Sequence, residues 1–165
     1  MPDKLMIVAH PDDESIFGGA ALLEGRGWKV VCVTNGNNRV RREEFAKAMR
    51  YVGAERDIWT FPDRRRGDFD RPALKEALRR TIEERPYRVI VTHGPEGEYG
   101  HPQHVALYEV LQELAGDRLR TFATCEHPLD LAILYRKLKL LRFYKSQDLD
   151  RYKAYVLFEK GNLLG

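Results

Sequence analysis

Two short segments of the chain concentrate residue types that can do chemistry. The first is the run His-Pro-Asp-Asp-Glu at residues 10–14, and the second ends in His101 and His104. Residues three apart share a face of a helix, so both of these imidazoles can point at one spot. Imidazole nitrogens and carboxylate oxygens are the usual ligands of a catalytic zinc, and two histidines with one carboxylate also suit ferrous iron. If the fold brings the two segments together, they form a metal site.

The acidic run also has a plainer interpretation. Carboxylates are favoured at the N-terminus of a helix, so Asp12 or Asp13 could be an N-cap with Glu14 in the first turn. That interpretation explains the acids and leaves His10 unexplained. A His-x-x-His spacing alone is a weak metal signal, and its combination with His-x-Asp-Asp in a second loop makes the metal site the stronger hypothesis.

Short apolar runs alternate with helical patterns along the chain. The runs have strand-like length and β-branched residues but no clean alternation, so we expect strands buried on both faces of a parallel sheet. They cover residues 5–9, 30–34, 58–61 and 89–92. The predicted helices cover residues 16–24, 41–52, 72–84 and 105–114. Pro72 fits a first turn and Gly53 fits a C-cap.

This order of elements predicts an α/β fold. We expect a Rossmann-like three-layer α/β/α sandwich with a mostly parallel sheet, in a single domain that spans residues 1–165. In open α/β sheets, ligands bind beyond the carboxyl ends of the strands. Residues 10–14 follow the first predicted strand and residues 93–104 follow the fourth. The two chemical segments are therefore expected at the same edge of the sheet.

Length and composition narrow the class of protein. The 165 residues are 43% hydrophobic and carry a formal net charge of +3, which fits one globular domain that buries about 70% of the surface of the unfolded chain. No apolar run approaches the ~20 residues of a membrane span, and the first residues do not resemble an export signal. Cys32 and Cys125 both sit in apolar runs, so we expect buried thiols in a reduced, cytoplasmic protein.

The two motifs resemble those of the LmbE-like / PIG-L family of zinc-dependent N-acetylglucosaminyl deacetylases. The resemblance rests on Ala-His-Pro-Asp-Asp-Glu at residues 9–14 and Gly-His-Pro-x-His at residues 100–104. Weaker similarities follow in family order at residues 34–36, Arg41, Glu44, residues 61–63 and residues 146–147. The similarity thus covers most of the chain.

The resemblance implies a metal and a base. His10, Asp13 and His104 would hold Zn²⁺, with Fe²⁺ as an alternative, and Asp12 would be the general base that activates water. This division suits amide hydrolysis, because a metal can polarise the poorly electrophilic carbonyl while a free carboxylate accepts a proton.

The resemblance also implies further site residues, each with a simpler alternative. His101 would stabilise the oxyanion or protonate the departing amine, or else only support a neighbouring imidazole. Tyr99 would polarise the carbonyl, or else be a packed loop aromatic. Arg41 and Asp63 would contact sugar hydroxyls, and Arg41 could instead pair with Glu44 on an exposed helix face.

The chain departs from the family pattern in two places. Gln103 stands where the family commonly has an aspartate, so we expect weaker orientation of His101 or His104. Little follows residues 146–147 except one predicted strand at residues 152–158. The wall that selects the aglycone is therefore expected to be reduced. His93, at a predicted strand end, is expected to be a hydrogen-bonded structural histidine.

The function predicted from these residues is metal-dependent hydrolysis of an N-acetyl group on an N-acetylglucosamine-containing small molecule, giving free amine and acetate. The alternatives are a metal-dependent hydrolase of another small amide, or an inactive family member that binds metal or sugar. The sequence leaves the oligomeric state open, a homo-oligomer included.

Two classes of macromolecular partner are disfavoured. The arginines at residues 64–66 are interleaved with nearby acids and lack an aromatic reading surface, so we expect no nucleic-acid partner and interpret this run as a rim that attracts an anionic substrate. Residues 129–144 form a basic amphipathic pattern. We expect a helix that packs its apolar face on the sheet and solvates its basic residues, without stable membrane insertion.

Overall fold

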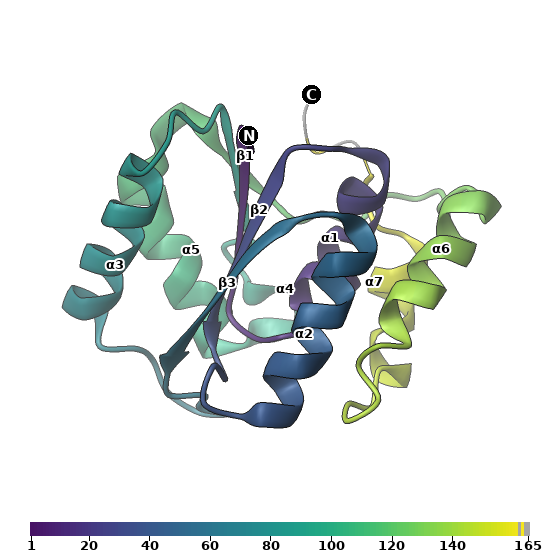
Figure 1. Ribbon diagram of the computed structural model, residues 1–165, viewed down its shortest axis with the longest axis horizontal. Helices are drawn as coiled ribbons and strands as arrows, with labels where there is room; N and C mark the ends of the chain where they lie inside the picture. Colours follow the sequence, from purple (N-terminus) through teal and green to yellow (C-terminus); the bar gives the residue numbers. More distant parts are fainter. Residues whose placement is uncertain (162, 164–165) are drawn as a thin grey trace.

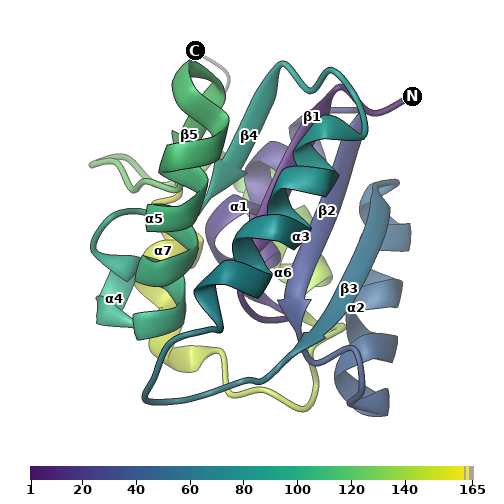
Figure 2. The same cartoon turned by 90° about the vertical axis from the view of Figure 1, so that its left-hand side faces the viewer.

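A five-stranded parallel sheet forms the centre of the molecule, with helices on both faces (Figures 1 and 2). The computed structural model describes residues 1–161 and 163. The strands are β1 (Lys4–Val8), β2 (Trp28–Thr34), β3 (Glu55–Phe61), β4 (Val89–Thr92) and β5 (Leu119–Thr121), in the spatial order β3-β2-β1-β4-β5. The helices are α1 (Asp13–Glu24), α2 (Arg39–Val52), α3 (Arg71–Glu83), α4 (Gly97–Gly100), α5 (Pro102–Ala115), α6 (Leu131–Leu141) and α7 (Lys153–Leu157), with 3₁₀ turns η1 (Gly116–Arg118) and η2 (Asp150–Tyr152). The predicted three-layer α/β fold is confirmed.

Alternate residues of the central strands contribute to two separate cores. Leu5 and Ile7 of β1 pack with α3 and α5 on one face. Met6 and Val8 pack with α1, α2 and α6 on the other. Because both faces are covered, β1, β2 and β4 are buried along their whole length, as a continuous apolar run predicts. The same expectation is wrong for β3, which lies at the sheet edge and begins with exposed residues.

The predicted helices correspond to α1, α2, α3 and α5, and their ends lie within three residues of the predicted ones. Gly53 ends α2 in the left-handed conformation, with φ 68°, and its N–H donates to Arg50 O. Pro72 lies in the first turn of α3. The sequence pattern does not predict strand β5, because three residues carry too little pattern.

The C-terminal part of the chain differs from expectation. Residues 152–158 form η2 and α7, so the prediction of a strand there is wrong. Tyr155 of α7 packs its ring against Phe17 of α1, with centroids 5.2 Å apart, so tertiary packing outweighs the β propensity of this segment. Cys32 is buried in β2 as expected, whereas Cys125 is exposed in the segment after β5, contrary to expectation.

Helix α6 packs against α1 rather than directly on the sheet, and one of its basic residues is buried. The ammonium of Lys137 donates to the carbonyls of Ile16 at 2.7 Å and Val156 at 3.2 Å, and it pairs with Glu159. The Glu159 carboxylate in turn accepts the N–H of Ala20 at 2.9 Å. The prediction that all the basic residues of this helix are solvated is therefore wrong for Lys137.

A glycine makes this arrangement possible. A Cβ on Gly19 would lie 3.0 Å from Cε of Lys137, closer than most such contacts, so the missing side chain makes room for the lysine to cross α1. The ion pair thereby ties α6 and the segment after α7 to the helix that begins at Asp13. In the part of the chain that the structure describes, no helix is both long and apolar enough to cross a bilayer.

We predict that Lys137→Met destabilises the protein by about 3–5 kcal/mol, because it leaves the buried Glu159 carboxylate without a cation. Denaturant unfolding monitored by circular dichroism measures the change in the free energy of unfolding. The exposed Lys139→Met on the same helix should change it by less than about 0.5 kcal/mol. Adding Glu159→Gln to Lys137→Met should recover part of the loss. If Lys137→Met alone were as stable as the wild type, the ion pair would not have this role.

Candidate metal site at the carboxyl end of the sheet

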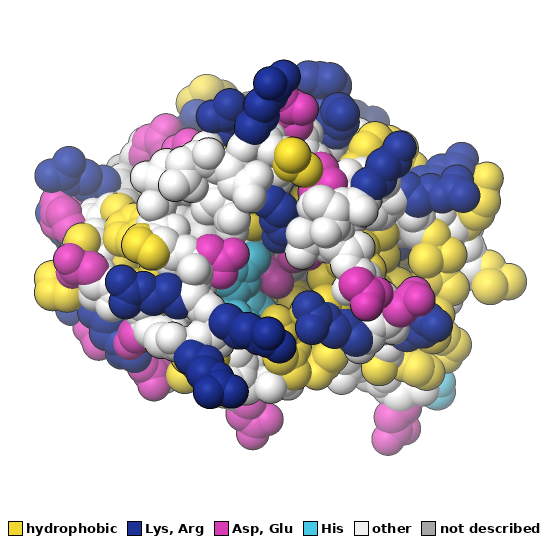
Figure 3. Space-filling model, turned by 90° about the horizontal axis from the view of Figure 1, so that it is seen from below, with side chains coloured by type: hydrophobic (Ala, Val, Ile, Leu, Met, Phe, Trp, Pro, Cys, Tyr) yellow, Lys and Arg dark blue, Asp and Glu magenta, His cyan; other side chains and the backbone are white. Residues whose placement is uncertain are grey.

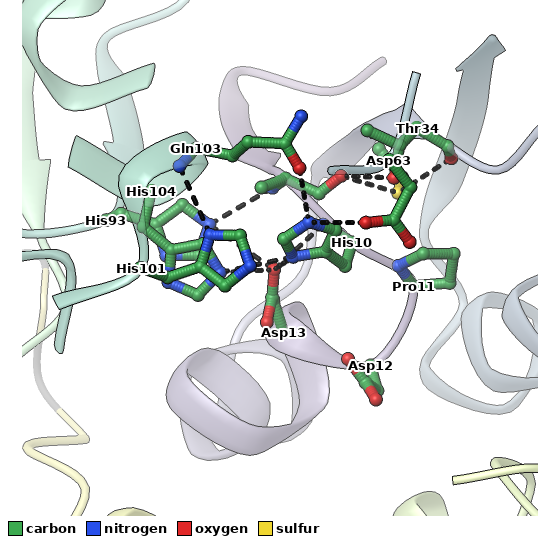
Figure 4. A network of polar contacts seen from close by, with 12 residues as sticks. His10, Pro11, Asp12, Asp13, Thr34, Asp63, His93, His101, Gln103 and His104 are labelled. Atoms are coloured by element: carbon green, nitrogen blue, oxygen red, sulfur yellow. Dashed lines mark hydrogen bonds and ion pairs between the residues drawn. The ribbon is translucent and has the colours of Figure 1, made fainter. Parts of the chain in front are cut away.

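The loops after β1 and β4 meet because these two strands are neighbours in the sheet. His10 lies in the loop between β1 and α1, Asp13 begins α1, and His104 lies in the first turn of α5. Figure 4 shows these side chains converging from the two loops. The expectation that both chemical segments lie at one edge of the sheet is confirmed.

Three ligand atoms form a nearly equilateral triangle. His10 Nδ1 lies 3.2 Å from His104 Nε2 and 3.3 Å from Asp13 Oδ2, and the last two atoms are 3.2 Å apart. All three residues are buried. Ligands at about 2.0–2.1 Å around a tetrahedral ion are about 3.3–3.4 Å from one another. The three donors therefore fit a single metal ion of zinc size.

Hydrogen bonds fix the tautomers of both imidazoles. His10 Nε2 faces Gln103 Oε1 at 2.9 Å and Asp63 Oδ1 at 3.4 Å. His104 Nδ1 faces Glu98 Oε2 at 3.3 Å. These oxygens only accept, so the facing nitrogens carry the protons of the neutral rings. The other ring nitrogens, His10 Nδ1 and His104 Nε2, point at the Asp13 carboxylate. They can carry protons when no metal is bound, and in the neutral rings their lone pairs are free to bind a metal ion.

Electrostatics at the triangle favour positive charge. Burial lowers the pKa of His10, but hydrogen bonds to Asp13 and Asp63 outweigh it and raise the pKa to about 10. Burial likewise opposes charge on His104, yet the Asp13 carboxylate raises the pKa of this imidazole to about 9. Burial opposes the charge of Asp13 as well, and the two imidazoles hold its pKa well below the usual range. The carboxylate therefore stays ionised and attracts cations.

Gln103 supports a different histidine from the one expected. Its Nε2 donates to Pro62 O at 2.8 Å and its Oε1 accepts from Arg64 N at 3.1 Å, which fixes the amide orientation. The oxygen then accepts from His10. The prediction that this residue affects the orientation of His101 or His104 is wrong, because the side chain of Gln103 lies toward the loop after β3.

His93 and Glu98 lie behind the triangle. His93 Nε2 accepts the N–H of Ala9 at 3.0 Å, and its Nδ1 lies 3.1 Å from Glu98 Oε1. Both of its nitrogens are engaged, so His93 is a structural histidine, as expected. Glu98 bridges His93 and His104 from a backbone with φ 59°, a conformation that non-glycine residues rarely adopt. Sequence reasoning missed this bridging role, for which the only signal is a position in a glycine-rich loop.

Asp12 occupies the N-cap position of α1 without capping it. Its φ is 120°, and its side chain makes no capping hydrogen bond within the described chain. The N–H of Asp12 donates instead to Glu14 Oε2 at 3.1 Å, and Arg41 Nη1 lies 3.7 Å from Asp12 Oδ2. Burial raises the pKa of Asp12, as does the charge of Asp13. Glu14 lies in the first turn as the plainer interpretation expected, but the Asp12 side chain does not cap the helix. The Asp12 carboxylate faces Arg41 and makes no hydrogen bond within the described chain.

Residues around this loop hold it in place. Arg41 is buried and donates to the carbonyl of Pro11, so its expected alternative, exposed pairing with Glu44, is wrong. Glu44 instead accepts from the backbone and hydroxyl of Ser146 at 2.8 and 2.7 Å. Glu14 is fully buried and accepts from the hydroxyl of Tyr144. Sequence reasoning missed Tyr144, which lies beyond α6.

A cavity of about 340 Å³ opens onto the triangle. Figure 3 looks onto the carboxyl ends of the strands and shows histidine in a hollow flanked by acidic and basic side chains. All eight site residues predicted from the sequence lie in or beside it: His10, Asp12, Asp13, Arg41, Asp63, Tyr99 and His101 in the lining and His104 behind. The lining residues that sequence reasoning did not place there are Gln147, Arg151 and Tyr152.

His101 and Tyr99 border the cavity on the α4–α5 side. His101 caps α5, because its Nδ1 accepts the N–H of Gln103 at 3.1 Å, so its Nε2 carries the hydrogen of the neutral ring. Burial lowers the pKa of His101 to about 4, helped by the neighbouring imidazoles. Tyr99 is half-exposed, burial raises its pKa, and its hydroxyl lies 3.5 Å from that of Tyr152.

The carboxyl edge of a parallel α/β sheet is where such folds bind ligands, and here two histidines and an aspartate converge there as a set of residues that could hold a metal ion. The sequence model of the PIG-L family, described as GlcNAc-PI de-N-acetylase, matches residues 5–115. The chain belongs to the PIG-L family.

The chain is also similar to individual proteins. The chain is 34% identical to an uncharacterized protein of Acanthamoeba polyphaga mimivirus, over 95% of this chain and 77% of that protein. It is 29% identical to a 1D-myo-inositol 2-acetamido-2-deoxy-alpha-D-glucopyranoside deacetylase of Streptomyces scabiei, over 68% of this chain and 47% of that protein, so it spans about half the length of that relative. The fold is similar to the crystal structure of a conserved protein from Thermus thermophilus, with a TM-score of 0.73, 24% identity, and coverage of 94% and 85% of the two chains.

We predict that Glu98→Gln weakens the affinity for a divalent metal about 10–100-fold. His93 and His104 face different oxygens of Glu98, and in a glutamine one of these positions becomes an NH2 group that only donates. One ring must then move its proton, and a proton on His104 Nε2 blocks a ligand atom. Competition with a chromophoric chelator measures the affinity. Glu96→Gln, an exposed neighbour, is the matched control. Equal affinities for both variants and the wild type would show that Glu98 does not set the tautomer.

Proposed function

We propose that this protein is a metal-dependent deacetylase that hydrolyses the N-acetyl group of an N-acetylglucosamine-containing small molecule, releasing acetate and a free amine. The observation that carries the proposal is the triangle of His10, Asp13 and His104 with the free, buried carboxylate of Asp12 beside it in one cavity. The deacetylase named among the relatives acts on a 2-acetamido sugar, which supports the same substrate class.

His10, Asp13 and His104 would hold the ion, and we propose Zn²⁺, with Fe²⁺ as the alternative. A bound divalent ion supplies a Lewis acid for the amide carbonyl and makes water more acidic. The residues fit such an ion, since two neutral imidazoles and one ionised carboxylate offer lone pairs at the right separation. Gln103, Asp63 and Glu98 orient these ligands from behind.

Asp12 accepts the proton of the attacking water. Burial and the charge of Asp13 raise the pKa of Asp12, which makes its carboxylate a stronger proton acceptor than that of an exposed aspartate. The strained backbone at Asp12 directs the carboxylate away from the helix N–H groups that would otherwise engage it. Arg41 lies near enough to keep this carboxylate in place.

His101 and Tyr99 act on the acyl group. The Nε2–H of neutral His101 donates a hydrogen bond to the developing oxyanion. Proton donation by His101 to the departing amine needs the imidazolium form, which its lowered pKa disfavours, so the proton that Asp12 takes from water is the one delivered to the amine. The hydroxyl of Tyr99 polarises the carbonyl from the cavity rim. Arg41 and Asp63 contact sugar hydroxyls, and Asp63 is suited to this because its side chain is about half-exposed while one oxygen faces His10.

The cysteines bear on the cellular compartment. Cys32 and Cys125 are both free thiols, and free thiols are usual in a reducing environment. We propose on this ground a cytoplasmic location. We also propose that residues 1–165 form a single domain.

We predict that Asp12→Asn lowers kcat about 10²–10⁴-fold while the metal content stays at the wild-type level, because only the proton acceptor is lost. His104→Ala should lose both metal and activity. Acetate release from N-acetyl sugars and plasma mass spectrometry of the dialysed proteins measure the two effects, with the remote Asp117→Asn as control. Near-normal turnover of Asp12→Asn would rule out this base, and a metal-replete His104→Ala would rule out the ligand set.

A further inference from the structure

The catalytic cavity is lined by three arginines from distant parts of the chain. Arg41 comes from the first turn of α2, Arg65 from the loop after β3, and Arg151 from η2. Such a convergence is costly unless something negative offsets it, since like charges in a confined site repel. Each of these guanidinium groups therefore calls for a negatively charged partner, from the protein or from a ligand.

The carboxylates of the cavity are engaged with other groups. Asp13 faces His10 and His104, and Asp63 accepts from Asn35 at 2.9 Å and faces His10. Asp12 is the acid nearest to an arginine, at 3.7 Å from Arg41. No carboxylate in the cavity is therefore left to neutralise Arg65 and Arg151.

Arg65 and Arg151 have no ion-pair partner within 4 Å among residues 1–161 and 163. Arg151 only lies over the ring of Tyr152, with its guanidinium carbon 5.0 Å from the centroid. Some other arginines of the described chain pair with acids, as Arg71 does with Asp68 at 2.6 Å, whereas others, such as Arg66 and Arg136, do not. Arg65 and Arg151 therefore differ from the other unpaired arginines in lining the cavity.

Arg41 provides an independent sign of a ligand. Its side chain is nine-tenths buried, and its Nη1 has no hydrogen-bond partner in the described chain. A buried donor without a partner destabilises the protein, because it loses its hydrogen bonds to water. An acceptor oxygen of a ligand in the cavity removes that penalty. The rest of the lining is polar too, with the amide of Gln147 and the hydroxyls of Tyr99 and Tyr152.

We propose that the sugar substrate carries an anionic group, a phosphate or a carboxylate, that binds Arg65 and Arg151 while the acetamido group lies at the metal triangle. This inference rests on the proposed deacetylase function and narrows it from N-acetyl sugars in general to charged ones. Guanidinium groups suit this task because their planar N–H donors match the oxygens of phosphate and carboxylate. Arg151 makes the η2 segment a determinant of substrate choice.

Binding calorimetry on zinc-loaded Asp12→Asn protein tests the proposal without turnover. The ligands are N-acetylglucosamine 1-phosphate, N-acetylmuramic acid, which carries a carboxylate, and the neutral methyl glycoside of N-acetylglucosamine. We expect at least one anionic sugar to bind about ten-fold or more tighter than the neutral one. The preferred anion distinguishes phosphate from carboxylate. The preference should shrink as NaCl is raised from about 50 to about 500 mM, because salt screens exposed charges.

Arginine variants assign the preference to residues. Arg65→Gln and Arg151→Gln should each lower the affinity for the anionic sugar about ten-fold and leave the neutral sugar unchanged. Arg66→Gln, an exposed neighbour in the same run that does not line the cavity, is the matched control. Equal binding of charged and neutral sugars, or a preference that survives both variants, overturns the proposal.

The two proposals fail separately. If the wild-type enzyme releases acetate from the neutral glycoside as fast as from the charged sugars, the charge inference is wrong and the deacetylase function stands. If the calorimetric preference for an anion depends on Arg65 and Arg151 but no acetylated sugar is hydrolysed, the anion site stands and the proposed reaction is wrong.

Discussion

The convergence of three electron-pair donors on one buried point is the constraint that the site depends on. His10 Nδ1, His104 Nε2 and Asp13 Oδ2 lie within 3.3 Å of one another. Without a metal ion, protons on the two imidazoles would offset the charge of the Asp13 carboxylate, and a metal ion would replace them. The surrounding hydrogen bonds maintain this arrangement, because Gln103 and Glu98 each hold a proton on the far side of an imidazole. The parallel pairing of β1 with β4 brings the two loops together.

Helix α1 carries much of the site, and the rest of the chain holds that helix in position. Its first residue is Asp13. The strained residue before it, Asp12, donates its N–H to the Glu14 carboxylate. Farther along, the buried pair of Lys137 and Glu159 holds the same helix across Gly19. Residues after β5 thus support the metal triangle without contacting it. The same segment contributes Arg151 to the cavity, so support and substrate selection come from one part of the fold.

The sequence predicted the features that depend on local pattern. Buried parallel strands produce continuous apolar runs, and ligands at strand ends follow those runs directly, so His10 and His104 could be placed at one sheet edge. Features set by tertiary packing could not be predicted. Glu98 orients two imidazoles from a strained backbone, and Lys137 is buried where Gly19 leaves room for its side chain. The strand expected at residues 152–158 is helical because α1 offers it a packing surface.

The most direct test of the metal triangle is the position of a metal ion in crystals of the protein grown with zinc, located by anomalous scattering at the zinc edge. We expect one strong peak bound by His10 Nδ1, His104 Nε2 and Asp13, at about 2.0–2.1 Å from the nitrogens. Asp12 should lie outside the coordination sphere. A peak bound instead between His93 and Glu98, coordination by Asp12, or no peak in crystals grown with excess zinc would contradict the proposed ligand set.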